Sequence, residues 1–369
     1  MSLSATVPSY RSIHMPIPAW PSASWLSAWP GGCSMSNKLV GKRVLVTGAS
    51  GFLGSRTVAA LVEHGCIVHA LVRKTSRTDH LTLPRVTIVP GDIAETESLK
   101  PAFAGVEYVV HAAANTRGDK EAGESSTVQG TRNVLALSAQ FKVRKLVYIS
   151  SCSVYGTADY NEGEVVTEES MLERFPEQRG AYSHAKFRAE QLVIDAMTKE
   201  QIPIVCLRPG TIYGPGSDLY SPMLGLSLGN KIFAVIGNGD FILPLVYVEN
   251  MVDAILAAMI SPLASRIYNV IDPEKVTKKQ YMEGLVHKLY PDSRTVYVPF
   301  SLLQALVFFQ EKVCRALGRP PVLTLYRLHS SQKAVVYEAL KIARDLAWRP
   351  PVKAAAAFDT LIRYSAGRN

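Results

Sequence analysis

Membrane-spanning runs, cysteine motifs and blocks of like charge are missing from this sequence of 369 residues. No apolar run reaches the roughly 20 residues that a membrane-spanning helix needs. The five cysteines are scattered, without a CxxC pair or a Cys/His cluster. This scatter argues against a metal site or a disulfide framework, so we expect a protein of a reducing compartment such as the cytoplasm. Hydrophobic residues make up 47% and charged residues 19%, which excludes a wholly disordered chain.

The net charge of +9 is concentrated in the last quarter of the chain, where residues 271–369 hold 16 Lys/Arg and 8 Asp/Glu. These basic residues are dispersed, and few aromatic residues lie among them. The sequence therefore shows no nucleic-acid-binding module, and we expect no nucleic-acid partner. Two interpretations stay open: an ordinary solvated surface, or a basic lobe that faces an anionic ligand or makes a peripheral contact with a membrane.

The first 36 residues differ from the rest in composition. Arg11 is their only charged side chain, five prolines interrupt any helix, and three of the four tryptophans lie here. A secretory signal has a basic start and then a continuous apolar run, and this segment has neither. We interpret residues 1–36 as a disordered tail or as the product of an upstream start codon, with Met35 the better start. Binding to a membrane surface or a partner through the tryptophans is the alternative.

A strand–turn–helix–strand pattern begins just after this segment. A short β-branched run over 43–47 reads as a buried parallel strand, a helical pattern covers about 52–64, and 67–72 reads as a second strand. The turn between the first strand and the helix carries Gly48, Gly51 and Gly54. Glycine lets the backbone approach a pyrophosphate, and the helix N-terminus supplies N–H groups. The placement of this GxxGxxG turn predicts a dinucleotide-binding unit.

The residues after the second strand indicate which dinucleotide binds. An acidic residue there binds a ribose 2′-hydroxyl, whereas arginine accommodates a 2′-phosphate. Here the strand is followed by Arg73 and Lys74, with Arg77 nearby and no acid before Asp79. We therefore expect a preference for NADP(H), with NAD(H) as the alternative.

Strands and helices continue to alternate beyond this unit. Further strands are expected over 86–89, 108–111, 146–149 and 204–207, with helical patterns between them around 96–103, 122–140 and 182–199. Such repeated units predict an α/β fold with a doubly wound parallel sheet. We expect this dinucleotide-binding domain over 37–210, with 240–271 returning to it. A smaller, mostly helical substrate lobe is expected from 211–239 and 272–369.

Tyr182 and Lys186 are the candidate catalytic pair. Residues four apart share one face of a helix, and a nearby ammonium lowers the pKa of a phenol from about 10. That makes tyrosine a usable proton donor or acceptor. A second pair with this spacing, Tyr337 and Lys341, is expected in a helix away from any strand end and is interpreted as structural. Ser151 follows a predicted strand, where its hydroxyl can hold a substrate oxygen against the tyrosine.

These motifs together resemble the extended short-chain dehydrogenases/reductases. TGASGFLG, GD, HAAA, ISSCSVYG, YSHAK and LRPGTIYGPG occur in that family's order over about residues 40–350. The resemblance implies a Rossmann-type sheet in which Ser151 positions the reacting oxygen, Tyr182 is the general acid/base, and Lys186 lowers the tyrosine pKa and binds the nicotinamide ribose. Thr127 departs from the family, which often has Asn there. The resemblance implies dinucleotide contacts at Gly48, Ser50, Gly51, Phe52, Leu53, Gly54, Arg73, Lys74, Asp92, Ile93, Ala112, Ala113, Ala114, Tyr182, Lys186 and Pro209.

Within that family, the substrate segments favour reduction or oxidation of an apolar small molecule. Thr211 stands where sugar epimerases have Asn, residues 243–250 lack their diphosphate-binding Arg, and no carboxyl follows Ser151 as in sugar dehydratases. The stretch 246–250 looks instead like the 3β-hydroxysteroid dehydrogenase branch. A steroid- or lipid-like alcohol or ketone is thus the expected substrate. The alternatives are a nucleotide-sugar 4-epimerase and a non-catalytic NAD(P)-sensing protein, and a homodimer is expected only by analogy.

An apolar segment over 298–309 stands out in the expected substrate lobe. We weigh three interpretations: a core helix, a wall of a lipid-like substrate pocket, or a helix lying on a membrane surface. It is too short to span a bilayer.

Overall fold

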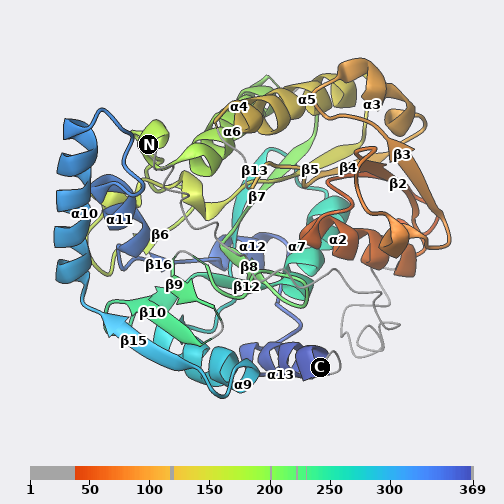
Figure 1. Cartoon of the computed structure of the whole chain (residues 1–369). Helices are drawn as coiled ribbons and strands as arrows, with labels where there is room; N and C mark the ends of the chain where they lie inside the picture. The colour runs from red at the N-terminus through yellow and green to blue at the C-terminus, as the bar shows by residue number, and fades with distance from the viewer. Residues whose placement is uncertain (1–37, 117–119, 200–201, 222, 230, 367–369) are drawn as a thin grey trace.

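Seven parallel strands form the central sheet of the computed structural model, in the spatial order β3-β2-β1-β4-β5-β7-β13 (Figure 1). The structure describes residues 38–116, 120–199, 202–221, 223–229 and 231–366, so the expected tail over 1–36 lies outside the described part. The strand order runs outward from β1 in both directions, which confirms the predicted doubly wound sheet. The strands are β1 (Arg43–Thr47), β2 (Ile67–Val72), β3 (Val86–Pro90), β4 (Tyr108–His111), β5 (Lys145–Ile149), β7 (Ile204–Pro209) and β13 (Arg266–Val270).

Helices cover both faces of this sheet. They are α2 (Phe52–Glu63), α3 (Thr96–Phe103), α5 (Gly130–Gln140), α6 (Ala181–Thr198) and α7 (Val248–Ile260). Successive strand residues point to opposite faces. In β1, Val44 and Val46 pack in the apolar cluster with α2 and α7, whereas Leu45 packs in the cluster with α3, α5 and α6. Both faces of the sheet are therefore core, as the near-continuous apolar strands predict.

The helix expected over 122–140 is divided into three pieces. These are α4 (Lys120–Gly123), a π-helical segment (Glu124–Gln129) and α5. Thr127 is buried in the π-helical segment, and its Oγ1 accepts a hydrogen bond of 2.9 Å from the backbone N–H of Asn115. The Thr127 hydroxyl thus connects the π-helical segment to the loop that follows β4.

The segments after β7, apart from α7 and β13, build a smaller lobe with its own apolar core. Three strands form a separate sheet in the order β15-β10-β9, and buried aromatic residues such as Tyr281 and Phe358 pack together beneath it. The elements of this lobe are β8 (Thr211–Tyr213), β9 (Gly225–Leu228), β10 (Ile232–Ile236), β11 (Ile242–Leu243), β12 (Leu245–Tyr247), β14 (Val276–Thr277), α8 (Lys278–Tyr281), α9 (His287–Leu289), β15 (Arg294–Val298), α10 (Phe300–Ala316), α11 (Leu325–Gln332) and α13 (Ala354–Ala366).

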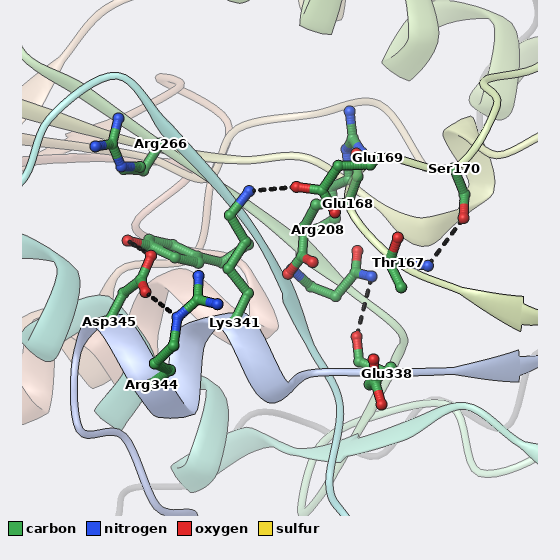
Figure 2. Close-up of polar contacts among 12 residues, drawn as sticks. Thr167, Glu168, Glu169, Ser170, Arg208, Arg266, Glu338, Lys341, Arg344 and Asp345 are labelled. Carbon is green, nitrogen blue, oxygen red and sulfur yellow. Dashed lines mark hydrogen bonds and ion pairs between the residues drawn. The ribbon is translucent and has the colours of Figure 1, made fainter.

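The prediction that Tyr337 lies in a helix is wrong. Tyr337 belongs to β16 (Val336–Tyr337), which pairs in parallel with β6 (Val165–Val166). Strand pairing is favoured here because the neighbouring Val335 is buried in the apolar cluster of β6. Lys341 begins a separate helix, α12 (Leu340–Asp345), and its ammonium binds Glu169 at 2.8 Å (Figure 2). The second Tyr–Lys pair is therefore not a pair on one helical face.

The apolar segment over 298–309 is not a core helix. It forms the first half of α10, in which Val307 alone is buried. Helix α10 lies at the edge of the molecule beside α11 (Figure 1). None of its residues lines the large cavity described below, so it does not form the wall of that cavity either.

A buried ion pair joins α6 to the central sheet. The Arg208 guanidinium donates to Glu190 at 2.6 Å, and both side chains are at most 2% exposed. Glu190 also accepts a hydrogen bond from the Ser150 hydroxyl, and Arg208 donates to the Tyr155 hydroxyl at 2.8 Å. Since each charge has several polar partners, the pair holds α6, β7 and the end of β5 in one arrangement.

Replacing Glu190 by Gln should destabilise the fold strongly. The substitution leaves the Arg208 charge buried without a counter-charge, which costs about 3–5 kcal/mol in the free energy of unfolding. Arg188→Gln, on the same helix, breaks the exposed ion pair with Glu124 and is the matched control, with an expected cost below about 1 kcal/mol. Urea unfolding of both variants measures this difference. Equal costs for the two variants would contradict the role given to the buried pair.

Candidate active site

A cavity of about 1080 Å³ opens at the carboxyl ends of the central strands and extends to the smaller lobe. Open parallel sheets bind ligands at this edge. Of the residues predicted from the sequence, Lys74 is exposed and lies outside the cavity lining. The other predicted residues all line the cavity: Gly48, Ser50, Gly51, Phe52, Leu53, Gly54, Arg73, Asp92, Ile93, Ala112, Ala113, Ala114, Ser151, Tyr182, Lys186 and Pro209.

Close backbone packing explains the glycines of the first turn. Gly48 has a φ of +70°, and a Cβ there would lie 2.8 Å from the backbone nitrogen of Ala113. A Cβ on Gly54 would lie 2.0 Å from the carbonyl oxygen of Gly48. Gly51 caps α2 without a side-chain hydrogen bond, which leaves the first N–H groups of that helix for a ligand. The turn therefore fits a dinucleotide pyrophosphate, held at Gly48, Ser50 and Gly51.

One end of the cavity lies at the carboxyl ends of β2 and β3. Arg73 is exposed directly after β2 and lines the cavity. Asp92 lines it too, and its Oδ1 accepts a hydrogen bond of 2.9 Å from the backbone N–H of Ala94. This contact closes the turn after β3, so the Asp92 side chain has a structural role as well as a place in the cavity.

Ser151 and Tyr182 are brought together from opposite ends of a long loop. Ser151 caps a 3₁₀ turn (Cys152–Val154), and its Oγ accepts a hydrogen bond of 3.1 Å from the N–H of Ser153. The Ser151 hydroxyl lies close enough to the Tyr182 phenol to affect its pKa. Burial raises the pKa of Tyr182, and the Ser151 hydroxyl acts in the opposite direction. The lowered pKa predicted from the spacing to Lys186 is therefore wrong for this state, because desolvation of the phenol outweighs any attraction from the lysine.

The Lys186 ammonium is directed to the end of β5. It donates to the carbonyl oxygen of Ile149 at 2.7 Å and lies 5.3 Å from the centre of the Tyr148 ring. Burial lowers the pKa of Lys186 to about 8, against the opposing effects of Cys206 and Glu190. An amine with that pKa is still mostly protonated at pH 7.

His111 is held neutral at the centre of the same edge. Its two ring nitrogens lie 2.7 Å from the Thr47 hydroxyl and 3.0 Å from the Thr131 hydroxyl. Burial lowers the pKa of His111 to about 3, with a smaller effect of Lys186 in the same direction. This histidine therefore stays uncharged over the physiological range.

The far end of the cavity contains residues that the sequence analysis did not identify. Met223 and Phe241 line it from the smaller lobe, and Tyr337 lines it from β16. Arg179 and Lys333 add positive charge, and they pair with Glu173 at 3.2 Å and with Glu162 at 3.7 Å. The sequence singles out Tyr337 only for its spacing to Lys341, where it is interpreted as structural, and the other residues belong to no local motif, so only the pairing of distant segments brings this set to the cavity.

Comparisons with known proteins agree with this geometry. The family model described as "NAD dependent epimerase/dehydratase family" matches residues 44–270. The sterol-4-alpha-carboxylate 3-dehydrogenase of Candida albicans is 30% identical over 333 residues, which are 84% of this chain and 93% of that protein. A 4-hydroxy-2-methyl-3-oxo-4-farnesyl-3,4-dihydroquinoline-1-oxide ketoreductase of Stigmatella aurantiaca is 28% identical over 288 residues, or 77% and 85% of the two chains.

Solved structures share the fold. The crystal structure of gox2253 superposes with a TM-score of 0.75 at 25% identity, over 89% of this chain and 99% of that one. A UDP-glucuronic acid 4-epimerase from Bacillus cereus, solved with UDP-glucuronic acid and NAD, has a TM-score of 0.68 at 19% identity, over 89% and 100% of the two chains.

Gly54→Ala should abolish dinucleotide binding while leaving the chain folded. The added Cβ overlaps the Gly48 carbonyl and must displace the turn that cradles the pyrophosphate. Gly284→Ala is the control, because its Cβ would meet only the movable Phe358 ring at 3.2 Å in the smaller lobe. Titration with NADPH, followed by its fluorescence, compares the two variants, and circular dichroism monitors folding. Unchanged NADPH affinity in folded Gly54→Ala would rule out this cradle.

Proposed function

The chain belongs to the NAD-dependent epimerase/dehydratase family and is an oxidoreductase of the extended short-chain type. We propose that it transfers hydride between NADP(H) and a secondary alcohol or ketone of an apolar, steroid- or lipid-like substrate. One observation carries this proposal. Ser151 and Tyr182 line the same cavity as the glycine turn, so a candidate proton donor and a candidate dinucleotide site share one space.

Tyr182, Ser151 and Lys186 would each have a separate role in the reaction. Tyr182 is protonated at neutral pH because its pKa is raised, so it enters a reduction as the proton donor to the carbonyl oxygen. Ser151 holds that oxygen against the phenol. A bound nicotinamide supplies or accepts the hydride. Lys186, fixed by the Ile149 carbonyl, would bind the ribose and add positive charge beside the phenol.

The substrate end of the cavity supports an apolar ligand. Ile212, Met223 and Phe241 line it, and the diphosphate-binding arginine of sugar epimerases has no counterpart in the sequence around Leu243. Two relatives named above are, by their names, a sterol carboxylate dehydrogenase and a ketoreductase of a farnesylated quinoline. A 3β-hydroxysteroid dehydrogenase-like activity is the specific form of the proposal.

Tyr182→Phe should remove activity without removing the dinucleotide. Loss of the phenolic proton is expected to lower kcat by about 100-fold or more, because general acid catalysis contributes at least that factor. Tyr337→Phe is the matched control in the same cavity, and it should alter KM for the ketone while leaving kcat largely unchanged. The assay is NADPH oxidation with ketosteroids, 3-oxoacyl compounds and nucleotide sugars.

Full activity in Tyr182→Phe would exclude the assigned mechanism. Copurified NAD with no net NADPH oxidation, together with epimerisation of a nucleotide sugar, would replace the proposal by the 4-epimerase alternative. NADPH binding with no turnover of any kind would favour the non-catalytic sensing protein.

Arg73→Ala should weaken NADPH selectively. The exposed guanidinium after β2 is placed to pair with a 2′-phosphate, and loss of such a charge-assisted contact raises the KM for NADPH by about tenfold. The KM for NADH should change little. Lys74→Ala is the control, since Lys74 is exposed outside the cavity lining. A wild-type preference for NADH, or an equal effect of Arg73→Ala on both dinucleotides, would remove the NADP(H) assignment.

A further inference from the structure

Helix α10 exposes an apolar face to solvent. Five of the exposed large apolar side chains on the helix and its C-terminal cap recur at intervals of four and three residues, so they lie on one side of the helix. Each of them is between 53% and 65% exposed. We call this set the α10 stripe: Leu302, Leu306, Phe309, Val313 and Leu317.

The side of α10 that packs on the protein is mixed, with polar Gln310 and Glu311 beside the buried Val307. The Gln310 side-chain oxygen accepts a hydrogen bond of 3.1 Å from the N–H of Leu323, and Glu311 accepts one of 2.8 Å from the N–H of Leu325. Val307 is buried on the same side. A normal surface helix buries its apolar stripe, whereas α10 leaves a long apolar stripe exposed. An exposed, contiguous apolar surface of this kind marks an interaction site.

Positive charge surrounds the stripe. Lys312, Arg315 and Arg319 are exposed on or just after α10, and the Lys312 ammonium lies 5.4 Å from the centre of the Phe308 ring. From 294 to 333 the sequence has six Lys/Arg, whereas Glu311 is its only acidic residue. That carboxylate is already engaged by the Leu325 N–H. A second copy of this chain would bring the same excess of positive charge against itself, so the charge favours an anionic partner.

A second apolar surface is joined to α10 by one residue. Strand β15 ends at Val298, and Pro299 leads into the helix. Across the β15-β10-β9 sheet, Val296 and Leu226 flank Ala234 in register, and both flanking side chains are more than half exposed. The opposite face of that sheet is core. The apolar, basic surface therefore extends beyond a single helix.

We propose that the α10 stripe docks this protein on an anionic lipid surface, with α10 lying in the plane of the interface. The apolar side chains enter the acyl region, and Lys312, Arg315 and Arg319 meet lipid phosphates and carboxylates. No helix among the described residues is long and apolar enough to cross a bilayer, so the contact is peripheral. Helix α11 packs beside α10, and its Ser330 and Ser331 line the active-site cavity, so docking sets the substrate end of the cavity close to the lipid.

Flotation of the full chain with vesicles tests this proposal. Vesicles of phosphatidylcholine with about one third phosphatidylserine should carry the protein, and vesicles of phosphatidylcholine alone should bind it more weakly. Leu306→Ser/Phe309→Ser should lower the partition coefficient by at least about tenfold. The matched control, Val40→Ser/Leu340→Ser, removes two exposed apolar side chains outside the stripe and should bind like wild type. NADPH affinity and thermal unfolding should stay unchanged in both variants, because all four side chains are exposed.

A charge variant separates electrostatics from apolar insertion. Lys312→Gln/Arg315→Gln/Arg319→Gln should lose the preference for phosphatidylserine and the salt dependence of binding. The proposal is overturned if wild type does not float with anionic vesicles, or if the stripe variant floats as well as wild type. It is also overturned if light scattering shows a wild-type dimer that the stripe variant converts to a monomer without any vesicle binding, since a second copy then covers the stripe.

Discussion

The attachment of α6 to the sheet is the constraint on which the site depends. Tyr182, Lys186 and Glu190 are spaced four residues apart and lie on one face of this helix. Glu190 is fixed by the Arg208 ion pair and Lys186 by the Ile149 carbonyl, so the turn that carries Tyr182 has little freedom. The phenol then meets Ser151 at the end of β5. The buried Arg208–Glu190 pair thus helps to set the position of the Tyr182 hydroxyl at the edge of the sheet.

The dinucleotide half of the site rests on a different physical requirement. At Gly48 and Gly54 the backbone of the turn, the helix and the loop after β4 approach so closely that no Cβ fits. This requirement concerns neighbouring residues, so it can be recognised in the sequence from the spacing of the glycines. The phenol and hydroxyl instead depend on side-chain contacts across a long loop. Both halves converge because parallel strands end at the same edge.

Features that are local in sequence could be predicted, and features that depend on distant segments could not. The strand–helix alternation, the glycine turn and the Tyr182–Lys186 spacing each reflect short-range periodicity, and the structure contains the predicted strands and helices. The spacing of Tyr337 to Lys341 predicts a helix, whereas the strand depends on pairing with Val166, which is far away in the sequence. The raised pKa of Tyr182 follows from burial, which is a tertiary property that a spacing of four residues does not contain.

The direction that the α10 stripe faces also could not be predicted from the sequence. An apolar run shows that a helix has an apolar face, but only the packing shows which way the face points. Here the hydrogen bonds of Gln310 and Glu311 orient the helix with its apolar side outward. Burying the stripe instead would leave these two side chains facing solvent and two backbone N–H groups without these acceptors. The orientation is therefore specified by the polar face. With the docking proposed above, an apolar substrate dissolved in lipid would reach the cavity through the lobe that carries the stripe.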